Sequence, residues 1–451
     1  MRKKLYIKTY GCQMNVYDSS RMADVVSPLG FVAVREPDAA DMIILNTCHI
    51  REKATEKVFS DLGRLREHKE RRALEGKQTL IAVAGCAAQA EGDEIMRRAS
   101  YVDMVFGPQA YHQLPEMIAK AARKVDEKGR GILNVDFPVQ SKFDSLPQTT
   151  TEQNVSAFLT IQEGCDKFCR FCCVPYTRGA EFSRSIDEVY QEASHLVNKG
   201  AKEITLLGQN VNAYHGVSPE NASQEWGLGR LMQHLSRIAG LHRIRYMTSH
   251  PRDVDQELIR THAEDPKVMP YIHLPVQSGS DAILKAMNRK HTSDKYRQII
   301  EQFRKARPDI AFSSDFIVGY PGETEADFED TLRLAADVQF AQAYSFKYSP
   351  RPGTPAAALE DQIPEAVKSE RLNRLQDLLR QQQNAFNEGT EGTTQTILLE
   401  KKGRESGQLV GRTPYLQVVH IQAPESMVGQ IIDVKITQSG TNTLHGEVVS
   451  A

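Results

Sequence analysis

Short apolar runs alternate with longer stretches of helical periodicity in the amino-terminal part of the chain. The amphipathic stretches predict helices over residues 18–28 and 52–72, and the apolar runs between them predict strands. The predicted strands cover residues 5–9, 31–34, 42–45, 80–84 and 102–106. Strands that alternate with helices form parallel sheets, so we predict an α/β fold with a doubly wound parallel sheet in this region.

A second series of strand and helix patterns begins at residue 157 and repeats six times. Its first strand covers residues 157–162, and the later strands begin near residues 204, 243, 271, 311 and 344. The helices cover residues 185–198, 228–239, 254–262, 292–306, 325–338 and 365–382. Six units are too few for a closed eight-stranded barrel, so we predict an open (β/α)6 partial barrel with its chemistry at the carboxyl ends of the strands.

The carboxyl-terminal segment changes to short strands of alternating polarity, separated by Gly and Asn turns. These strands cover residues 396–399, 408–411, 416–421, 431–437 and 444–449, which favours a small β-barrel of the oligonucleotide-binding type. Residues 126–154 are rich in Gly, Pro, Gln, Ser and Thr and show little periodicity, which predicts a linker. The expected domains are therefore 1–125, 155–385 and 386–451.

Composition places the chain among soluble globular proteins, with 40% hydrophobic and 25% charged residues. No apolar run approaches the ~20 residues that span a bilayer, so we expect no membrane partner. The seven cysteines are odd in number and are grouped for ligation, which favours a reducing, cytoplasmic location. The net charge of −2 means that any nucleic-acid binding depends on local patches.

Three cysteines, Cys165, Cys169 and Cys172, lie within the segment EGCDKFCRFC (163–172) after the first strand of the second series. Thiolates are soft ligands that suit zinc, copper(I) or iron–sulfur clusters. A structural zinc site takes four protein ligands, whereas a four-iron cluster held by three cysteines leaves one iron open to a substrate or cofactor. We predict the cluster; the alternatives are a zinc site completed by a distant residue, or packed thiols.

Three predicted strands of the amino-terminal region are each followed by a cysteine, which gives a second set of thiols. Cys12, Cys48 and Cys86 each follow the carboxyl end of a strand, and in a parallel sheet those ends lie together at a ligand-binding crevice. We therefore predict a second three-cysteine iron–sulfur site, against the alternative of three unrelated buried cysteines. His49 is interpreted as a capping or packing residue and not as a fourth ligand.

The cluster segment, together with VPYTRGAEFSRS (174–185), resembles the radical S-adenosylmethionine methylthiotransferase family, and within it the MiaB type of tRNA-2-methylthio-N6-isopentenyladenosine synthase. The segments GCQMN (11–15), NTC (46–48) and GC (85–86) match the amino-terminal domain of that family. The resemblance implies two [4Fe-4S] clusters. The cluster on Cys165, Cys169 and Cys172 would cleave S-adenosylmethionine to a radical that takes hydrogen from adenine C2. The other would hold a sulfur atom methylated by a second S-adenosylmethionine.

The resemblance also implies partners and further site residues. The partners are tRNA, S-adenosylmethionine, a low-potential electron donor and a sulfur donor. The S-adenosylmethionine contacts would be Gln209 and Asn210 near the methionyl group, Gln277 and Ser278 near the ribose, and Ile317 to Gly319 near adenine. Residues that help to position cofactor or substrate would be Arg178, Glu181 and Arg184, and Cys173 is interpreted as a packing residue.

The carboxyl-terminal barrel resembles the TRAM module, whose RNA role would rest here on Lys401, Lys402, Arg404 and Arg412. A purely stabilising or protein-contacting barrel is the alternative. Two other functions stay open on the sequence. One is a methylthiotransferase that acts on threonylcarbamoyl-adenosine or on a ribosomal-protein aspartate, and the other is a non-catalytic iron–sulfur or zinc protein that binds RNA.

Overall fold

The computed structural model describes residues 2–49, 52–123, 131–138, 141–147, 155–221 and 223–449. The chain divides into two compact units. The first unit comprises Met1–Glu152, Gly164–Asp166 and Cys173–Glu181, and the second comprises Gln153–Glu163, Lys167–Cys172 and Phe182–Ala451. The segment with three closely spaced cysteines is therefore shared: Cys165 belongs to the first unit, and Cys169 and Cys172 belong to the second.

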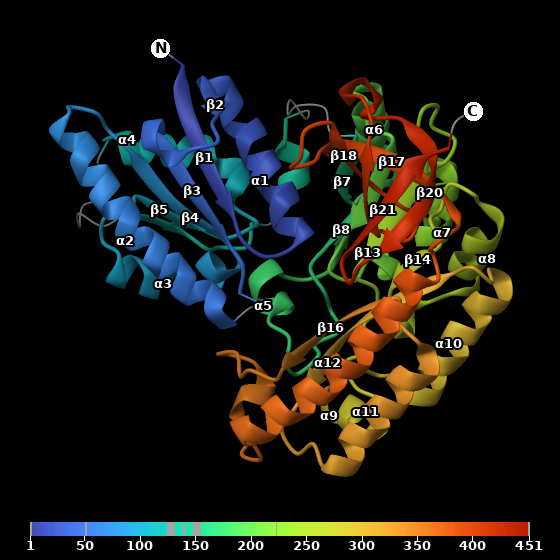
Figure 1. Cartoon of the computed structure of the whole chain (residues 1–451). Helices are drawn as coiled ribbons and strands as arrows, with labels where there is room; N and C mark the ends of the chain where they lie inside the picture. Colours follow the sequence, from blue (N-terminus) through green and yellow to red (C-terminus); the bar gives the residue numbers. More distant parts are fainter. Residues whose placement is uncertain are drawn as a thin grey trace. The chain divides into compact units, whose positions relative to one another are not determined.

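The first unit is built on a parallel sheet with strand order β2-β1-β3-β4-β5-β6. The strands are β1 (Lys3–Thr9), β2 (Phe31–Ala33), β3 (Met42–Thr47), β4 (Leu80–Gly85), β5 (Met104–Phe106) and β6 (Ile132–Asn134). Met42 and Ile44 pack on one face with α1 (Gln13–Val26) and α4 (Leu114–Arg123). Ile43 and Leu45 pack on the other face with α2 (Glu52–Leu74) and α3 (Cys86–Arg98). Figure 1 shows α2 and α3 beside the sheet. Alternate residues of one strand thus bury opposite faces, which confirms the doubly wound sheet.

The segment predicted as a linker carries structure that the sequence did not indicate. β6 adds a sixth strand beside β5, and the sheet register pairs Met104 with Ile132. Further along, Lys142 is 1% exposed, and its Nζ donates to the carbonyl of Pro108. The described part of residues 126–154 is therefore built into the first unit, whereas residues 148–154 lie outside the described residues.

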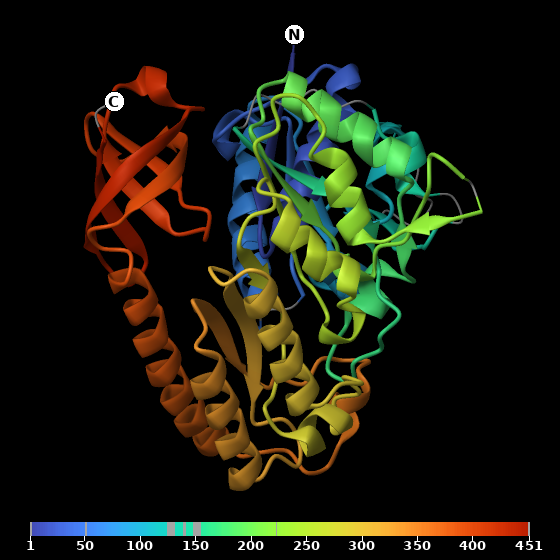
Figure 2. The same ribbon diagram turned by 90° about the vertical axis from the view of Figure 1, so that its right-hand side faces the viewer.

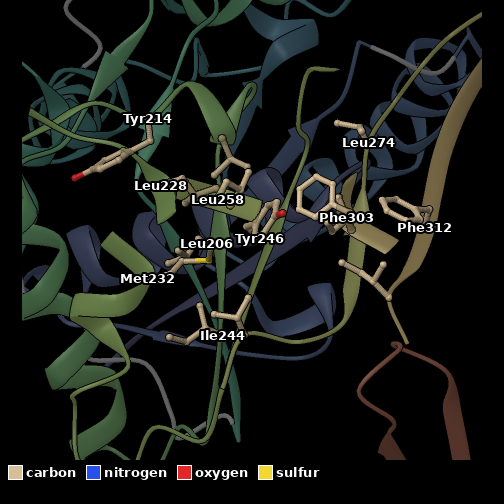
Figure 3. Packing of buried hydrophobic residues seen from close by; sticks show 14 of the residues in the cluster. Leu206, Tyr214, Leu228, Met232, Ile244, Tyr246, Leu258, Leu274, Phe303 and Phe312 are labelled. Atoms are coloured by element: carbon tan, nitrogen blue, oxygen red, sulfur yellow. The ribbon is translucent and has the colours of Figure 1, made fainter. Parts of the chain in front are cut away.

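The second unit begins with six parallel strands in two sheets, of orders β13-β10-β7 and β14-β15-β16. They are β7 (Ser156–Thr160), β10 (Glu203–Leu207), β13 (Arg243–Met247), β14 (Tyr271–His273), β15 (Ala311–Val318) and β16 (Gln342–Lys347). The helices that follow these strands include α6 (Ile186–Asn198), α7 (Leu228–Leu235), α8 (Gln256–Glu264), α10 (Ser293–Ala306), α11 (Glu325–Val338) and α12 (Glu365–Glu388). Figure 3 shows how Leu206 and Ile244 of the strands pack with Met232 of α7. The predicted (β/α)6 partial barrel is confirmed.

The carboxyl-terminal strands close into a barrel of order β17-β18-β19-β21-β20, which confirms the predicted small β-barrel (Figure 2). They are β17 (Thr394–Lys402), β18 (Gln408–Arg412), β19 (Val418–Gln422), β20 (Ile431–Ser439) and β21 (Thr443–Val448). Two buried arginines of β13 bind this barrel through its backbone. Arg243 donates to the carbonyls of Thr396 and Arg412, and Arg245 donates to those of Thr413 and Pro414. Among the described helices, none is both long enough and apolar enough to cross a membrane.

Candidate functional site

The first set of thiols lies at the carboxyl edge of the amino-terminal sheet. Cys12 follows β1 and caps α1, which begins earlier than predicted, at Gln13. Cys86 is the first residue of α3, directly after β4, and the buried Cys48 follows β3. Cys12 and Cys86 therefore lie at helix amino termini.

The backbone next to these thiols leaves no room for larger residues. Gly11 and Gly85 have φ angles of +98° and +91°, which L side chains rarely adopt. A Cβ atom at Gly11 would lie 2.7 Å from Sγ of Cys48. Cys48 therefore lies against Gly11, the residue before Cys12. Cys86, the third cysteine of the set, lies near enough to Cys12 for that thiol to add to the effect of burial in raising its pKa.

A buried arginine contacts this set of thiols. Burial raises the pKa of Cys86, and the positive charge of Arg178 opposes that shift. Arg178 is 3% exposed, and its Nη2 donates to Asp18 Oδ2 at 2.7 Å and to Asn15 Oδ1 at 3.1 Å. Asn15 in turn donates to the carbonyls of Tyr10 and Thr47. Arg178 therefore brings a cation, already paired with a carboxylate, to the thiols at the sheet edge.

The three polar residues that the sequence grouped beyond the cluster segment separate in the structure. Arg178 ends the short helix α5 (Val174–Arg178) in the first unit. Arg184 belongs to the second unit, where it pairs with Glu192 at 2.7 Å and donates to the carbonyl of Thr160. The backbone N–H of Glu181 donates to Asp166 Oδ1. His49 pairs with Glu91 at 3.4 Å, in line with its interpretation as a packing residue.

The cluster segment is held at several points along its length. The N–H of Cys165 donates to the carbonyl of Gly179 at 3.2 Å, within the first unit. In the second unit, the N–H of Cys172 donates to the carbonyl of Cys169, and Nη1 of Arg289 lies 3.6 Å from Cys169 Sγ as a donor. A buried guanidinium thus contacts one thiol of this set too.

The thiols fit iron–sulfur ligation by their chemistry. Among the described residues, no group of three or more His, Cys, Asp or Glu side chains is gathered as a single metal ion requires. The ligands of a four-iron cluster bind different iron atoms, so they lie further apart than the ligands of one ion. Three thiols with an adjacent buried cation suit such an anionic cluster.

The loops that follow β7, β10 and β13 are tied together by one carboxylate. Asp253 accepts from Lys167 Nζ at 3.0 Å and from Asn210 Nδ2 at 2.7 Å. The buried side chain of Gln162 accepts from the N–H groups of Gln209 at 2.9 Å and Asn210 at 3.2 Å. The predicted methionyl contacts are therefore placed beside the cluster segment, at the carboxyl ends of these strands.

Two of the other predicted contacts are also neighbours. Gln277, with φ of +78°, accepts a backbone hydrogen bond from Ile317 and donates one to Asp315. Ser278 is fully buried, and its hydroxyl lies 3.2 Å from that of Thr331, so it contributes to the packing of this loop against α11. The structure thus joins Gln277 to Ile317 and turns Ser278 toward the helix.

The last predicted contact, Gly319, rests on a buried ion pair. Its N–H donates to Glu323 at 2.7 Å, and Arg371 donates to the same carboxylate at 2.9 Å. Burial raises the pKa of Glu323 to about 7, although the Gly319 N–H and Arg371 oppose the shift. This carboxylate fixes the turn after β15.

Comparisons with known proteins identify the family. Three family models match: the uncharacterized protein family UPF0004 over residues 4–107, the radical SAM superfamily over 159–335 and the TRAM domain over 388–449. The tRNA-2-methylthio-N(6)-dimethylallyladenosine synthase of Maricaulis maris (strain MCS10) is 57% identical over 452 residues, which cover 100% of this chain and 98% of that protein. The chain belongs to the radical S-adenosylmethionine methylthiotransferases.

Solved structures share the fold of this methylthiotransferase at 12% identity. The radical S-adenosylmethionine methyltransferase TsrM from Kitasatospora setae matches with a TM-score of 0.57, over 79% of this chain and 75% of that one. The cobalamin-dependent radical enzyme OxsB matches with a TM-score of 0.55, over 84% of this chain and 56% of its own. Membership of the radical SAM superfamily implies a [4Fe-4S] cluster and S-adenosylmethionine as cofactors.

Sequence reasoning missed several residues of the methylthiotransferase that contact its thiols or loops. They are Asn15, Asp18, Gln162, Asp253, Asn288, Arg289, Glu323 and Arg371. Gln162 could have been found, because it ends the strand that leads into the cluster segment. Asn15 lies within the GCQMN segment, and Glu323 lies four residues after Gly319. For Asp18, Asp253, Asn288, Arg289 and Arg371, the partners named above lie far away along the chain, so no spacing motif marks them.

Proposed function

We propose that this methylthiotransferase attaches a methylthio group to C2 of N6-isopentenyladenosine next to the anticodon of tRNA and uses two molecules of S-adenosylmethionine. The full-length similarity to a tRNA-2-methylthio-N(6)-dimethylallyladenosine synthase carries this proposal. The presence of two three-cysteine sets, each beside a buried arginine, supports it. The TRAM domain supports tRNA as the partner.

Two [4Fe-4S] clusters are proposed, one for each set of cysteines. Cys165, Cys169 and Cys172 would hold the cluster that, when bound and reduced, supplies the electron for cleavage of S-adenosylmethionine. Cys12, Cys48 and Cys86 would hold the second. The argument for this assignment is the chemistry of the donors, since soft thiols beside a buried guanidinium suit an anionic cluster.

The protein's own residues would position the cofactor. Asp253 holds the cluster segment and the loop of Gln209 and Asn210 through Lys167 and Asn210. Gln277 and Ser278 would lie near the ribose, and Ile317 and Gly319 near the adenine. The carboxylate of Glu323 fixes the Gly319 turn by accepting a hydrogen bond from the Gly319 N–H.

Further partners are an electron donor of low potential and a sulfur donor, and the proposed location is the cytoplasm. The proposed RNA contacts of the barrel are Lys401, Lys402, Arg404 and Arg412. Arg243 and Arg245 of β13 donate their hydrogen bonds to backbone carbonyls of the barrel, so these bonds do not involve the four basic side chains. The proposed domains are 1–125, 155–385 and 386–451, and the described part of the proposed linker 126–154 belongs to the first compact unit.

The test is mass spectrometry of tRNA nucleosides from cells that lack this gene. The proposal expects loss of the 2-methylthio form and accumulation of N6-isopentenyladenosine, with recovery when the native chain is restored. Restoration with Cys169→Ala should give no recovery. If the methylthio form of threonylcarbamoyl-adenosine is lost and 2-methylthio-isopentenyladenosine is unchanged, the proposed substrate is wrong. The enzyme would then belong to the branch of the family that acts on threonylcarbamoyl-adenosine.

A further inference from the structure

We propose that Arg289 is a positioning residue of the cluster segment, and that its guanidinium raises the reduction potential of the cluster held by Cys165, Cys169 and Cys172. The inference rests on the proposed assignment of that cluster. Its first support is a direct contact. Nη1 of Arg289 donates to Cys169 Sγ at 3.6 Å, and Nη2 donates to the carbonyl of Pro275.

The residues around Arg289 clamp the cluster segment through the backbone. The side chain of Asn288 donates to the carbonyls of Phe168 at 2.9 Å and Lys167 at 3.3 Å. The carbonyl of Met287 accepts from the N–H of Arg170 at 3.0 Å. The two residues before Arg289 and Arg289 itself therefore hold the segment from Lys167 to Arg170 at four points.

The backbone at this clamp is strained on both sides of the contact. Phe168, Asn288 and Lys290 have φ angles of +49°, +62° and +59°. Residues other than Gly adopt such angles rarely, and they persist where the surrounding structure fixes them. Three of them at one contact indicate that the position of Arg289 against the thiol is fixed by the fold.

The charge of Arg289 is not neutralised by a carboxylate. It is 5% exposed, its Nε has no hydrogen-bond partner, and no Asp or Glu in the described part of the chain forms an ion pair with it. The nearby His250 and His291 are kept neutral, because burial lowers the pKa of both rings, that of His291 to about 4. The positive charge of Arg289 therefore acts on Cys169 from a buried position, without a carboxylate paired to it in the described part of the chain.

An N–H donor and a positive charge beside a ligating sulfur stabilise the more negative, reduced form of a cluster. Hydrogen bonds to the sulfurs and solvent exposure are among the factors that set cluster potentials. Arg289 thus makes the cluster easier to reduce and holds Cys169 in place for ligation. Removal of the guanidinium should lower the potential even where iron is retained.

The experiment uses the full chain with Cys12, Cys48 and Cys86 changed to alanine, so that the cluster segment carries the remaining cluster. After anaerobic reconstitution, iron and sulfide are measured per chain, and the midpoint potential is measured by spectroelectrochemistry. Arg289→Met should lower the reduced-to-oxidised ratio about tenfold at a fixed potential, which is about 59 mV for a one-electron couple. Arg289→Lys, which keeps the charge, should give a smaller shift.

Arg307→Met is the matched control, because Arg307 also donates to backbone carbonyls, those of His262 and Val268, but contacts no thiol. Its potential should equal that of the parent. An unchanged potential in Arg289→Met with full iron would overturn the inference. If that variant holds no iron, Arg289→Gln is judged by the same criterion, and loss of iron from both would overturn the claim on potential. A parent chain that holds zinc would instead contradict the proposed function.

Discussion

The two sets of cysteines differ in how the fold assembles them and in how their arginines are neutralised. Cys12, Cys48 and Cys86 come from three strands of one sheet, and the arginine beside them, Arg178, is paired with Asp18. Cys169 and Cys172 come from one short segment held by a clamp, and Arg289 has no carboxylate. The cysteines of the first site are brought together from three distant parts of the sequence, whereas those of the second lie within one segment that residues about 120 positions away hold in place.

This difference predicts that the two sites can be removed separately. The variant with Cys12, Cys48 and Cys86 changed to alanine should still cleave S-adenosylmethionine to 5′-deoxyadenosine but form no methylthio product. The variant with Cys165, Cys169 and Cys172 changed to alanine should make no 5′-deoxyadenosine. Each should keep about one four-iron cluster where the parent has about two.

The assay is chromatography of 5′-deoxyadenosine and of modified nucleoside, with isopentenylated tRNA as substrate and iron measured in parallel. The parent chain reconstituted in the same batch is the control. Methylthio product from the variant that lacks Cys12, Cys48 and Cys86 would break the comparison, because sulfur would then not pass through that site.

The Arg178–Asp18 ion pair allows the two cysteine sites to be compared by their effect on the unfolding free energy. Arg178→Met leaves the buried carboxylate of Asp18 without its main partner, so the first unit should lose roughly 3 kcal/mol of unfolding free energy. Asp18→Asn in the same chain should restore part of that stability, because the uncompensated carboxylate is gone, but Lys142 Nζ, which lies 3.6 Å from Asp18 Oδ1, then loses its ion-pair partner. Calorimetric unfolding of the single and double variants measures both effects.

Iron content separates the two roles of Arg178. With Cys165, Cys169 and Cys172 changed to alanine, the double variant should fold but bind less iron than its parent, because the cation beside Cys86 is gone. Full iron in the double variant would mean that Arg178 supports the fold alone. Arg289→Met leaves no carboxylate unpaired, so it should cost less stability than Arg178→Met.

The buried carboxylate Glu323 gives the second unit a dependence on pH that can be measured by itself. Burial raises its pKa from the ordinary value of 4.5 to about 7, so the folded state binds the proton more tightly than the unfolded state. The resulting stability is fully present below pH 4.5 and is lost as the pH rises through about 7. Glu323→Gln should flatten this decline.

Trp226 makes the measurement specific, because it is the chain's one tryptophan and lies buried in the core of the second unit. Urea unfolding followed by its fluorescence at pH 5, 6, 7 and 8 therefore reports on that unit. Glu325→Gln, at a half-exposed carboxylate that also pairs with Arg371, is the control and should keep the parent's slope. A parent whose stability rises between pH 5 and 7 would contradict the raised pKa.

Most helices and strands can be predicted from the sequence because the spacing of apolar residues that identifies them lies within each element. α11 was predicted at its observed bounds, and the strands of the partial barrel and the closed barrel were all found. β6 (Ile132–Asn134) was missed because it lies in a segment with the composition of a loop and is only partly buried. Residues 131–147 are built into the first unit through β6 and Lys142, which composition alone did not indicate.

The candidate site was predictable in part for the same reason. The cysteines have spacing or strand ends to mark them, whereas Arg178 contacts Asp18, 160 residues away, and no pattern encodes that contact. Arg289 follows the six-residue helix α9 (Asp281–Ala286) at a strained turn, which residue preferences disfavour. Contacts between distant residues thus formed the part of the site that the sequence did not reveal.

The smallest effect is expected at Cys173, where the chain passes from the second unit to the first. Cys173 is 8% exposed and caps α5, and its carbonyl accepts from the N–H groups of Tyr176 and Thr177. Valine has a similar volume and leaves these backbone bonds intact, so Cys173→Val should change stability by less than about 1.5 kcal/mol and keep both clusters and activity. Cys172→Val, one residue earlier, should lose the cluster proposed for Cys165, Cys169 and Cys172. Iron analysis and 5′-deoxyadenosine formation compare the two. Loss of iron in Cys173→Val would mean that Cys173 is a cluster ligand and that its interpretation as a packing residue is wrong.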